Sequence, residues 1–133
     1  MNVSYPMVSE RAGHRCEYCH APEVVFNFPF EVEHIIPVSR DGTNSESNLA
    51  LACRSCNLFK SNHTTANDPA SGEETGLFHP RHDHWAAHFL IEPETYRIQG
   101  QTAIGRGSVS CLQLNHSLSL AARKIWVELG LFP

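Results

Sequence analysis

The chain has 133 residues, of which 41% are hydrophobic, and this length and composition predict one globular domain with a modest core. Fourteen acidic residues against ten basic ones give a formal net charge of −4, which argues against a strongly basic nucleic-acid-binding surface. No apolar run is long enough to cross a bilayer, and the first residues lack the basic and apolar regions of a signal peptide. We therefore expect a cytoplasmic, reducing location, where C-x-x-C pairs bind metal more often than they form disulfides.

The first half of the chain alternates between short regular segments and turn-forming residues. The segment 24–36 is rich in β-branched and aromatic residues, which favour strands, but Pro29 interrupts it. It therefore predicts two short strands or one bent strand. The predicted elements of this half are a helix at about 5–14, the strand structure within 24–36, a loop at 39–48, a strand at Leu49–Ala52 and a helix from about Ser55 to Ser61.

The second half begins with a polar segment, 62–76, that contains proline and glycine and predicts an extended loop. Farther on, alternating residues in 89–102 predict a hairpin that turns at Pro93–Glu94. Apolar residues at helical spacing predict two C-terminal helices. The predicted elements of this half are the loop at 62–76, one or two helical turns at 83–89, the hairpin at 89–102, and helices at 105–114 and 118–129.

Four of the five cysteines form two C-x-x-C pairs. The pairs are Cys16/Cys19 and Cys53/Cys56. Two thiolates at i and i+3 can reach one ion from a tight turn, and two such turns complete a tetrahedral zinc shell. A closed shell leaves no position for a substrate, so this pattern predicts a structural zinc. His14 and His20 flank the first pair and could replace one of the cysteine ligands.

The run from Cys16 to Lys60 reads CEYC…VEHIIPVSRDGTNSESNLALACRSCNLFK. It contains an acidic–His pair, then a loop with an Asn before a Leu, then a helix that begins C-x-x-C-N-x-x-K. This run resembles an HNH endonuclease domain with accessory zinc knuckles, in the variant whose third named residue is Asn57 rather than His. The residues after Gly76 resemble, more loosely, an extension found on some bacterial members.

The resemblance implies an α+β fold, with a small ββα-metal core, a four-cysteine structural zinc site, and a C-terminal hairpin followed by two helices. It implies a single nuclease domain over residues 1–133, with its core at about 11–63 and its extension at about 77–133. The implied activity is that of a metal-dependent endonuclease, a phosphodiester hydrolase that acts on DNA, in the first place double-stranded DNA.

Hydrolysis of a phosphodiester needs a base for the attacking water and a cation for the phosphate. A neutral imidazole titrates near working pH, so His34 is the expected base. Carboxylate and amide oxygens suit Mg²⁺ or Mn²⁺, with Ni²⁺ and Zn²⁺ as alternatives. The middle Asn of the family should keep the base aimed. The expected site residues are His34, Asn48 and Asn57 in catalysis, Glu33 and Asn57 on the divalent metal, and Lys60 and Arg54 on substrate phosphate.

Other interpretations stay open. Neighbouring residues on a regular strand point to opposite faces, so Glu33 and His34 can serve one phosphate only if the strand twists or ends there. The acidic composition favours a non-catalytic, zinc-stapled module that binds nucleic acid or protein, or an enzyme to which a protein partner delivers DNA. In the extension, His84 and His88 at i, i+4 could share a second metal ion, although packing against the core is the expected role of that segment.

Overall fold

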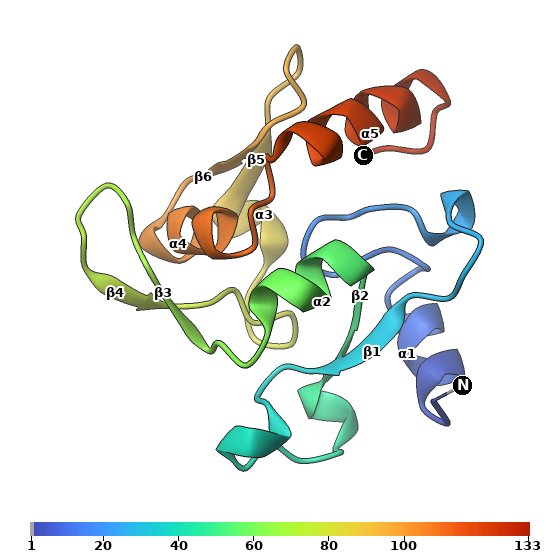
Figure 1. Cartoon of the computed structure of the whole chain (residues 1–133), viewed down its shortest axis with the longest axis vertical. Helices are drawn as coiled ribbons and strands as arrows, with labels where there is room; N and C mark the ends of the chain where they lie inside the picture. The colour runs from blue at the N-terminus through green and yellow to red at the C-terminus, as the bar shows by residue number, and fades with distance from the viewer. Residues whose placement is uncertain (1) are drawn as a thin grey trace.

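Two antiparallel strands and the helix after them form the unit that carries the motif residues (Figure 1). In this computed structural model, which describes residues 2–133, β1 spans Glu31–His34 and β2 spans Leu49–Ala52. The register pairs Glu31 with Ala52 and His34 with Leu49. The helix α2, Arg54–Lys60, follows β2 directly, so the predicted strand–loop–strand–helix unit is confirmed.

The segment before β1 contains less strand than the sequence predicts. After α1 (Tyr5–Arg11), a single 3₁₀ turn covers Glu23–Val25, and only the last four residues before Ile35 pair as a strand. The reason is local hydrogen bonding. The Phe26 amide donates to the Glu23 carbonyl oxygen at 2.9 Å, and the Phe30 amide donates to Glu23 Oε2 at 2.7 Å, so these donors are not free for a partner strand.

The loop between β1 and β2 folds back against the end of β1. It contains two 3₁₀ turns, Val38–Arg40 and Glu46–Asn48. Between them, the Gly42 amide donates to the Pro37 carbonyl oxygen at 2.9 Å. Gly42 lies so close to Ile36 that only a residue without a Cβ fits there.

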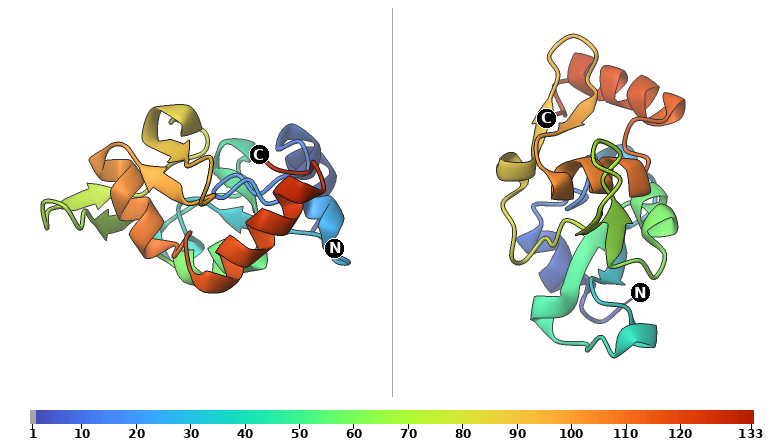
Figure 2. Two further views of the ribbon diagram at one scale, coloured as in Figure 1. Left: turned by 90° about the horizontal axis from the view of Figure 1, so that it is seen from above. Right: turned by 90° about the vertical axis from the view of Figure 1, so that its left-hand side faces the viewer.

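Residues 62–76 correct a second expectation, because they form a hairpin rather than an extended loop. The strands β3 (Thr65–Asn67) and β4 (Glu74–Gly76) pair antiparallel, and the hairpin protrudes at one side of the molecule (Figures 1 and 2). Its turn is held from outside, since Arg106 Nε and Nη2 donate to the two carboxylate oxygens of the buried Asp68 at 2.9 and 2.8 Å. That contact joins residues far apart in the chain, and local sequence does not predict it.

The C-terminal half contains the predicted hairpin and the two predicted helices. Figure 2 shows these elements on the opposite side of the molecule from the β1–β2 loop. In chain order they are α3 (Trp85–His88), β5 (Phe89–Ile91), β6 (Ile98–Gly100), α4 (Ala103–Cys111) and α5 (Ser117–Glu128).

One hydrophobic cluster includes residues from both halves of the chain. It contains the whole of β2 together with Phe78, Phe89, Ile98 and Leu112. The division into a core at about 11–63 and an extension at about 77–133 stays a prediction, but the two parts share this cluster. Among residues 2–133, no helix is long and apolar enough to span a membrane.

The close approach at Gly42 leads to a prediction for stability. A Cβ at this position would lie 1.7 Å from the carbonyl oxygen of Ile36, so Gly42→Ala forces the backbone of the loop to move. We expect the free energy of unfolding to fall by about 1–3 kcal/mol, measured by chemical denaturation.

Gly76→Ala is the matched control, because a Cβ added there meets no atom within 4 Å. This control should stay within about 0.5 kcal/mol of the wild type. Equal stability of the two variants would show that the loop does not pack tightly on Ile36.

Candidate functional site

The four paired cysteines lie together in the interior. Their sulfur atoms are all within 4.8 Å of one another, and Cys19 Sγ lies 3.7 Å from Cys53 Sγ. Four sulfurs bound to one zinc at about 2.3 Å in a tetrahedron are separated by about 3.8 Å. The cluster is therefore compatible with one zinc ion in a closed four-sulfur shell. It consists of Cys16, Cys19, Cys53 and Cys56, all buried.

Local backbone geometry presents the sulfurs from two tight turns. In the first turn the Cys16 amide donates to the Ala21 carbonyl oxygen at 3.0 Å, and the His20 amide donates back to the Cys16 carbonyl oxygen at 2.9 Å. In the second turn Cys53 is the N-cap of α2, and its sulfur accepts from the Cys56 amide at 3.5 Å. A ligand of the second turn thus also caps the helix that carries Asn57.

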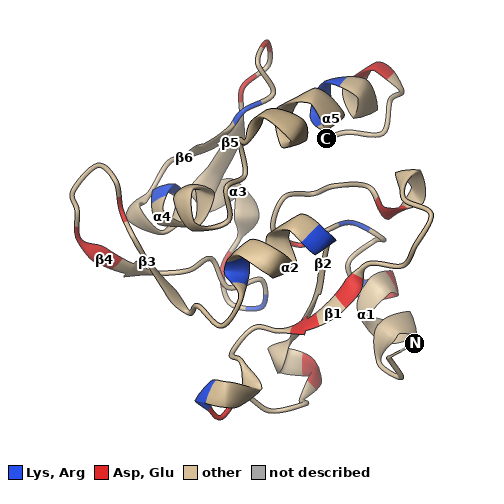
Figure 3. Cartoon of the chain, viewed as in Figure 1, with Lys and Arg blue, Asp and Glu red and all other residues tan. Residues whose placement is uncertain are grey.

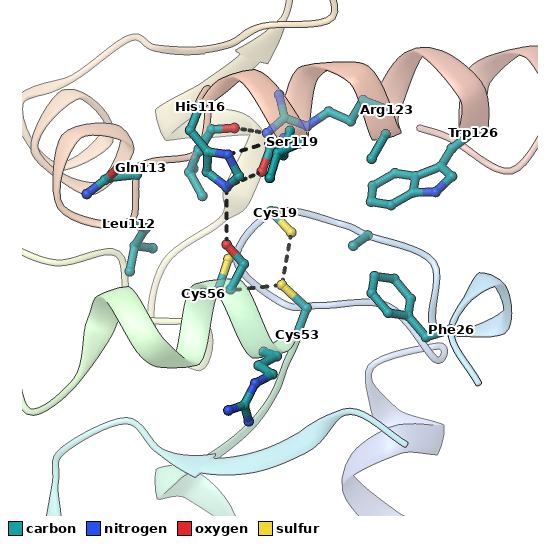
Figure 4. Close-up of a pocket in the computed structure, with 16 residues that line it drawn as sticks. Cys19, Phe26, Cys53, Cys56, Leu112, Gln113, His116, Ser119, Arg123 and Trp126 are labelled. Atoms are coloured by element: carbon teal, nitrogen blue, oxygen red, sulfur yellow. Dashed lines mark hydrogen bonds between the residues drawn. The ribbon is translucent and has the colours of Figure 1, made fainter. Parts of the chain in front are cut away.

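The C-terminal helix covers this cluster from the other side. Figure 4 shows Cys19, Cys53 and Cys56 between α2 and α5, with His116, Ser119 and Arg123 of α5 and its N-cap above them. A cavity of about 180 Å³ is lined by residues of the cysteine cluster on one side and of α5 on the other, with Phe26 and Trp126 at one end. Burial lowers the pKa of the Arg123 guanidinium, and the nearby cysteines oppose that effect.

The short helix α3 supports the first cysteine turn. Trp85 Nε1 donates to the Tyr18 carbonyl oxygen at 2.8 Å, and the Trp85 ring stacks on His20 with centroids 4.0 Å apart. His88 Nδ1 bonds to Thr102 Oγ1 at 2.7 Å rather than to His84. In the described part of the chain the four cysteines are the only group of three or more possible metal ligands that lie together, and neither His84 nor His88 belongs to such a group.

His34 ends β1 and is half-buried. Its Nε2 lies 2.7 Å from Oδ1 of Asn44, a residue of the loop that follows. The buried Asn48 holds that loop: its Nδ2 donates to the carbonyl oxygens of Thr43 at 2.8 Å and Ile36 at 3.0 Å, and its Oδ1 accepts from the Ile36 amide at 2.8 Å. Asn48 therefore acts on the loop around His34 and does not touch the imidazole.

Glu33 points the other way, into the core. One of its oxygens accepts a hydrogen bond from the buried Tyr18 hydroxyl, and its Oε2 lies 3.0 Å from Lys60 Nζ. Burial raises the pKa of Glu33 although Lys60 and Tyr18 both act to lower it, and burial together with the charge of Glu33 raises the pKa of Tyr18.

The position of Lys60 corrects the expectation that it contacts substrate phosphate. Its side chain is 2% exposed, and besides Glu33 its ammonium donates to the carbonyl oxygens of His34 at 3.2 Å and Ile35 at 2.9 Å. These three acceptors use all the donors of an ammonium group. Lys60 therefore holds the end of β1 from inside and has no donor left for a ligand.

Asn57 meets a different carboxylate from the one expected. Its Nδ2 donates to Glu31, while Arg54 Nη1 lies 3.4 Å from the other oxygen of Glu31. Glu31 and Glu33 are two residues apart on β1 and share a face, so Asn57 and Lys60, one turn apart on α2, each face one of them. The structure thus brings Asn57 directly to Glu31 and places Glu33 beside that pair.

The basic residues are scattered over the chain (Figure 3), and most of their side chains bond to other groups of the protein. Arg81 pairs with Glu17, and Arg106 pairs with Asp68. Others donate to backbone carbonyl oxygens; these are Arg11, Arg15, Arg40 and Arg123. Arg54, by contrast, has a side chain that is 76% exposed and makes only the long contact with Glu31.

Three residues of the site are absent from the sequence-based expectation. Glu31 has a detectable signal, because strand alternation places it on the face of Glu33. Tyr18 lies inside the first cysteine turn, and nothing in the pattern indicates that its hydroxyl reaches Glu33. Asn44 sits in a turn-rich loop, where an asparagine is ordinary, so only the folded loop reveals its contact with His34.

Comparison with known proteins gives one match. Residues 16–63 match the family model described as HNH endonuclease, and this segment of the chain contains both cysteine pairs, His34, Asn48 and Asn57. This part of the chain is therefore similar to that family. No curated protein and no solved structure gives a significant match to the chain.

The cysteine cluster predicts that metal content and folding change together. Cys53→Ser removes a sulfur ligand but keeps a side chain that can cap α2, so we expect loss of zinc, measured by elemental analysis, and loss of the cooperative thermal transition because the metal is missing. Cys111→Ser is the control, because Cys111 lies outside the cluster. Zinc retained at the wild-type level in Cys53→Ser would contradict the four-sulfur site.

The buried ion pair predicts a pH-dependent loss of stability. In Lys60→Met, Glu33 loses its cation and must either stay ionised without it or take up a proton at neutral pH, which should cost about 3–5 kcal/mol in the free energy of unfolding. Because the folded protein raises the pKa of Glu33, the cost of burying its charge is absent at low pH and appears as pH rises through the raised pKa. The loss should therefore be larger near pH 8 than near pH 5.

Glu33→Gln combined with Lys60→Met tests the cause. The double variant removes the buried charge, so it should recover part of the stability and lose the pH dependence of the single variant. A deficit in Lys60→Met that is the same at both pH values would mean that the lost carbonyl contacts, and not the unpaired carboxylate, determine the cost.

Proposed function

We propose that this protein is a metal-dependent endonuclease that hydrolyses DNA phosphodiester bonds, with His34 as general base and a structural zinc in the four-cysteine cluster. The observation that supports this most is the position of His34 inside the segment that matches the HNH endonuclease family. There, at the end of β1, one ring nitrogen is bonded to Asn44 and the ring is partly exposed. A base needs both a fixed ring and access to water.

The hard-oxygen donors for a divalent ion come from β1 and α2. Asn57 and Glu33 are the predicted ligands, and Glu31 lies against Asn57. Such donors suit Mg²⁺ or Mn²⁺, and a bound ion would supply charge stabilisation for the phosphate. Glu33 can join the ion only by exchanging its contact with Lys60 or Tyr18, whereas Glu31 needs only to release Arg54 and Asn57.

Substrate contact is proposed for the exposed Arg54 at the start of α2. An arginine there can donate to a phosphate oxygen beside the metal donors. The net charge of −4 and the internal use of most other basic groups favour a weak, salt-sensitive grip on DNA. This feature also supports the variant of the proposal in which a protein partner delivers the DNA.

A plasmid-cleavage assay tests the proposed activity. Purified protein is incubated with supercoiled DNA and Mg²⁺, Mn²⁺ or Ni²⁺, with EDTA as the metal-free arm. We expect metal-dependent cleavage that His34→Ala reduces by at least about 10²-fold, since general-base catalysis contributes about 10²–10⁴-fold. Zinc content and thermal stability of this variant should equal those of the wild type.

His82→Ala is the matched control, because His82 is exposed and lies outside the matched segment. It should cleave like the wild type. Cleavage that survives in His34→Ala would exclude His34 as base. Absence of cleavage in every metal, with zinc bound, would favour a binding module or a nuclease that requires a partner.

A further inference from the structure

We propose that Asn44 is a positioning residue for His34: its side-chain oxygen fixes the imidazole in the tautomer that carries its proton on Nε2 and leaves Nδ1 to accept the proton of the attacking water. This inference rests on the proposed function for its catalytic meaning. The hydrogen bond and the tautomer that carry it are properties of the folded chain alone.

The chemistry of the contact determines the tautomer. Asn44 Oδ1 lies 2.7 Å from His34 Nε2, and an amide oxygen can only accept a hydrogen bond. Nε2 must therefore carry the proton. In the neutral ring the other nitrogen then has a free lone pair. Among residues 2–133, no protein group forms a hydrogen bond with Nδ1.

The loop is built to hold Asn44 at that position. The amide of Asn48 binds the carbonyl oxygen of Thr43, the residue before Asn44, and both backbone groups of Ile36, two residues after His34. Gly42 packs against the carbonyl oxygen of Ile36, where no Cβ fits. Asn48 thus connects the backbone next to Asn44 with the backbone next to His34. It positions Asn44, and Asn44 in turn contacts the imidazole of His34.

An anchor of this kind is required because the rest of the site does not hold the ring. Lys60 fixes the carbonyl oxygens of His34 and Ile35, which sets the backbone but leaves the imidazole free to rotate. Rotation about the terminal torsion of His is broad, and a half-turn exchanges the positions of the two ring edges. The bond to Asn44 selects one orientation.

The first experiment reads the tautomer directly. The full chain with zinc bound is labelled with ¹⁵N at histidine, and long-range ¹H–¹⁵N correlations distinguish protonated from unprotonated ring nitrogens. The spectrum of His34→Gln assigns the signals among the nine histidines. We expect wild-type His34 to carry its proton on Nε2, and Asn44→Ala to show exchange between both tautomers.

The second experiment reads the effect on cleavage. Asn44→Ala should lower kcat by about tenfold with little change in KM, by analogy with the groups that orient metal-bound histidines. Asn44→Asp keeps the acceptor and so should recover most of the rate. Because its carboxylate also stabilises the imidazolium, the acid limb of the pH–rate profile should move to higher pH. Ser47→Ala, in the same loop but bonded to Ser45, should change neither.

The outcomes separate the two proposals. A wild-type His34 with its proton on Nδ1, or a tautomer unchanged in Asn44→Ala, overturns the role of Asn44 whatever the activity. Cleavage that survives in His34→Ala overturns the proposed function but leaves the tautomer result standing. Loss of rate in Asn44→Asp equal to that in Asn44→Ala, without a shift of the pH profile, also overturns the positioning role.

Discussion

The proximity of four sulfur atoms is the constraint on which the site depends. Cys16 and Cys19 precede β1, whereas Cys53 and Cys56 begin α2, so the cluster joins the two segments that flank the β1–β2 hairpin. The helix α2 has only seven residues, which is too short to be stable by itself. Its place above β1 is set at its N-terminus by the cluster. A short helix can then present Asn57 and Lys60 to defined positions on a short strand.

A series of buried polar contacts connects the first cysteine turn and α2 to the end of β1. Tyr18, from the first cysteine turn, donates to Glu33, Glu33 pairs with Lys60, and Lys60 donates to the carbonyl oxygens beside the His34 side chain. Every member is satisfied, which matters because a buried charge without a partner is costly. Glu33 and His34 are neighbours on a strand, so their side chains point to opposite faces, and the structure uses both directions. Glu33 faces inward to this network, and His34 turns outward to the loop.

The sequence predicts those features that depend on spacing and period. The cysteine spacing, the strand Leu49–Ala52 and the two C-terminal helices follow from such patterns, and the structure confirms them. Features that depend on long-range partners are different. The β3–β4 hairpin is held by Arg106, and the burial of Lys60 follows from a carboxylate on another element. From the sequence alone, a lysine after C-x-x-C-N is expected to bind substrate phosphate, and only the folded structure shows that its acceptors lie inside the protein.

The distribution of charge bears on the proposed action on DNA. Non-specific affinity for DNA comes largely from cations that replace counterions on the phosphates. Here most guanidinium groups serve as internal donors to backbone oxygens or carboxylates, as with Arg11 and Arg106. Arg54 is exposed beside the proposed metal donors, and Arg97 and Lys124 are exposed in the C-terminal half, but three cations would release few counterions. If the proposed function holds, much of the binding energy has to come from a bound divalent ion, from uncharged contacts or from a partner. For the proposed nuclease, such an arrangement favours cleavage of DNA that is already positioned over a search along the duplex.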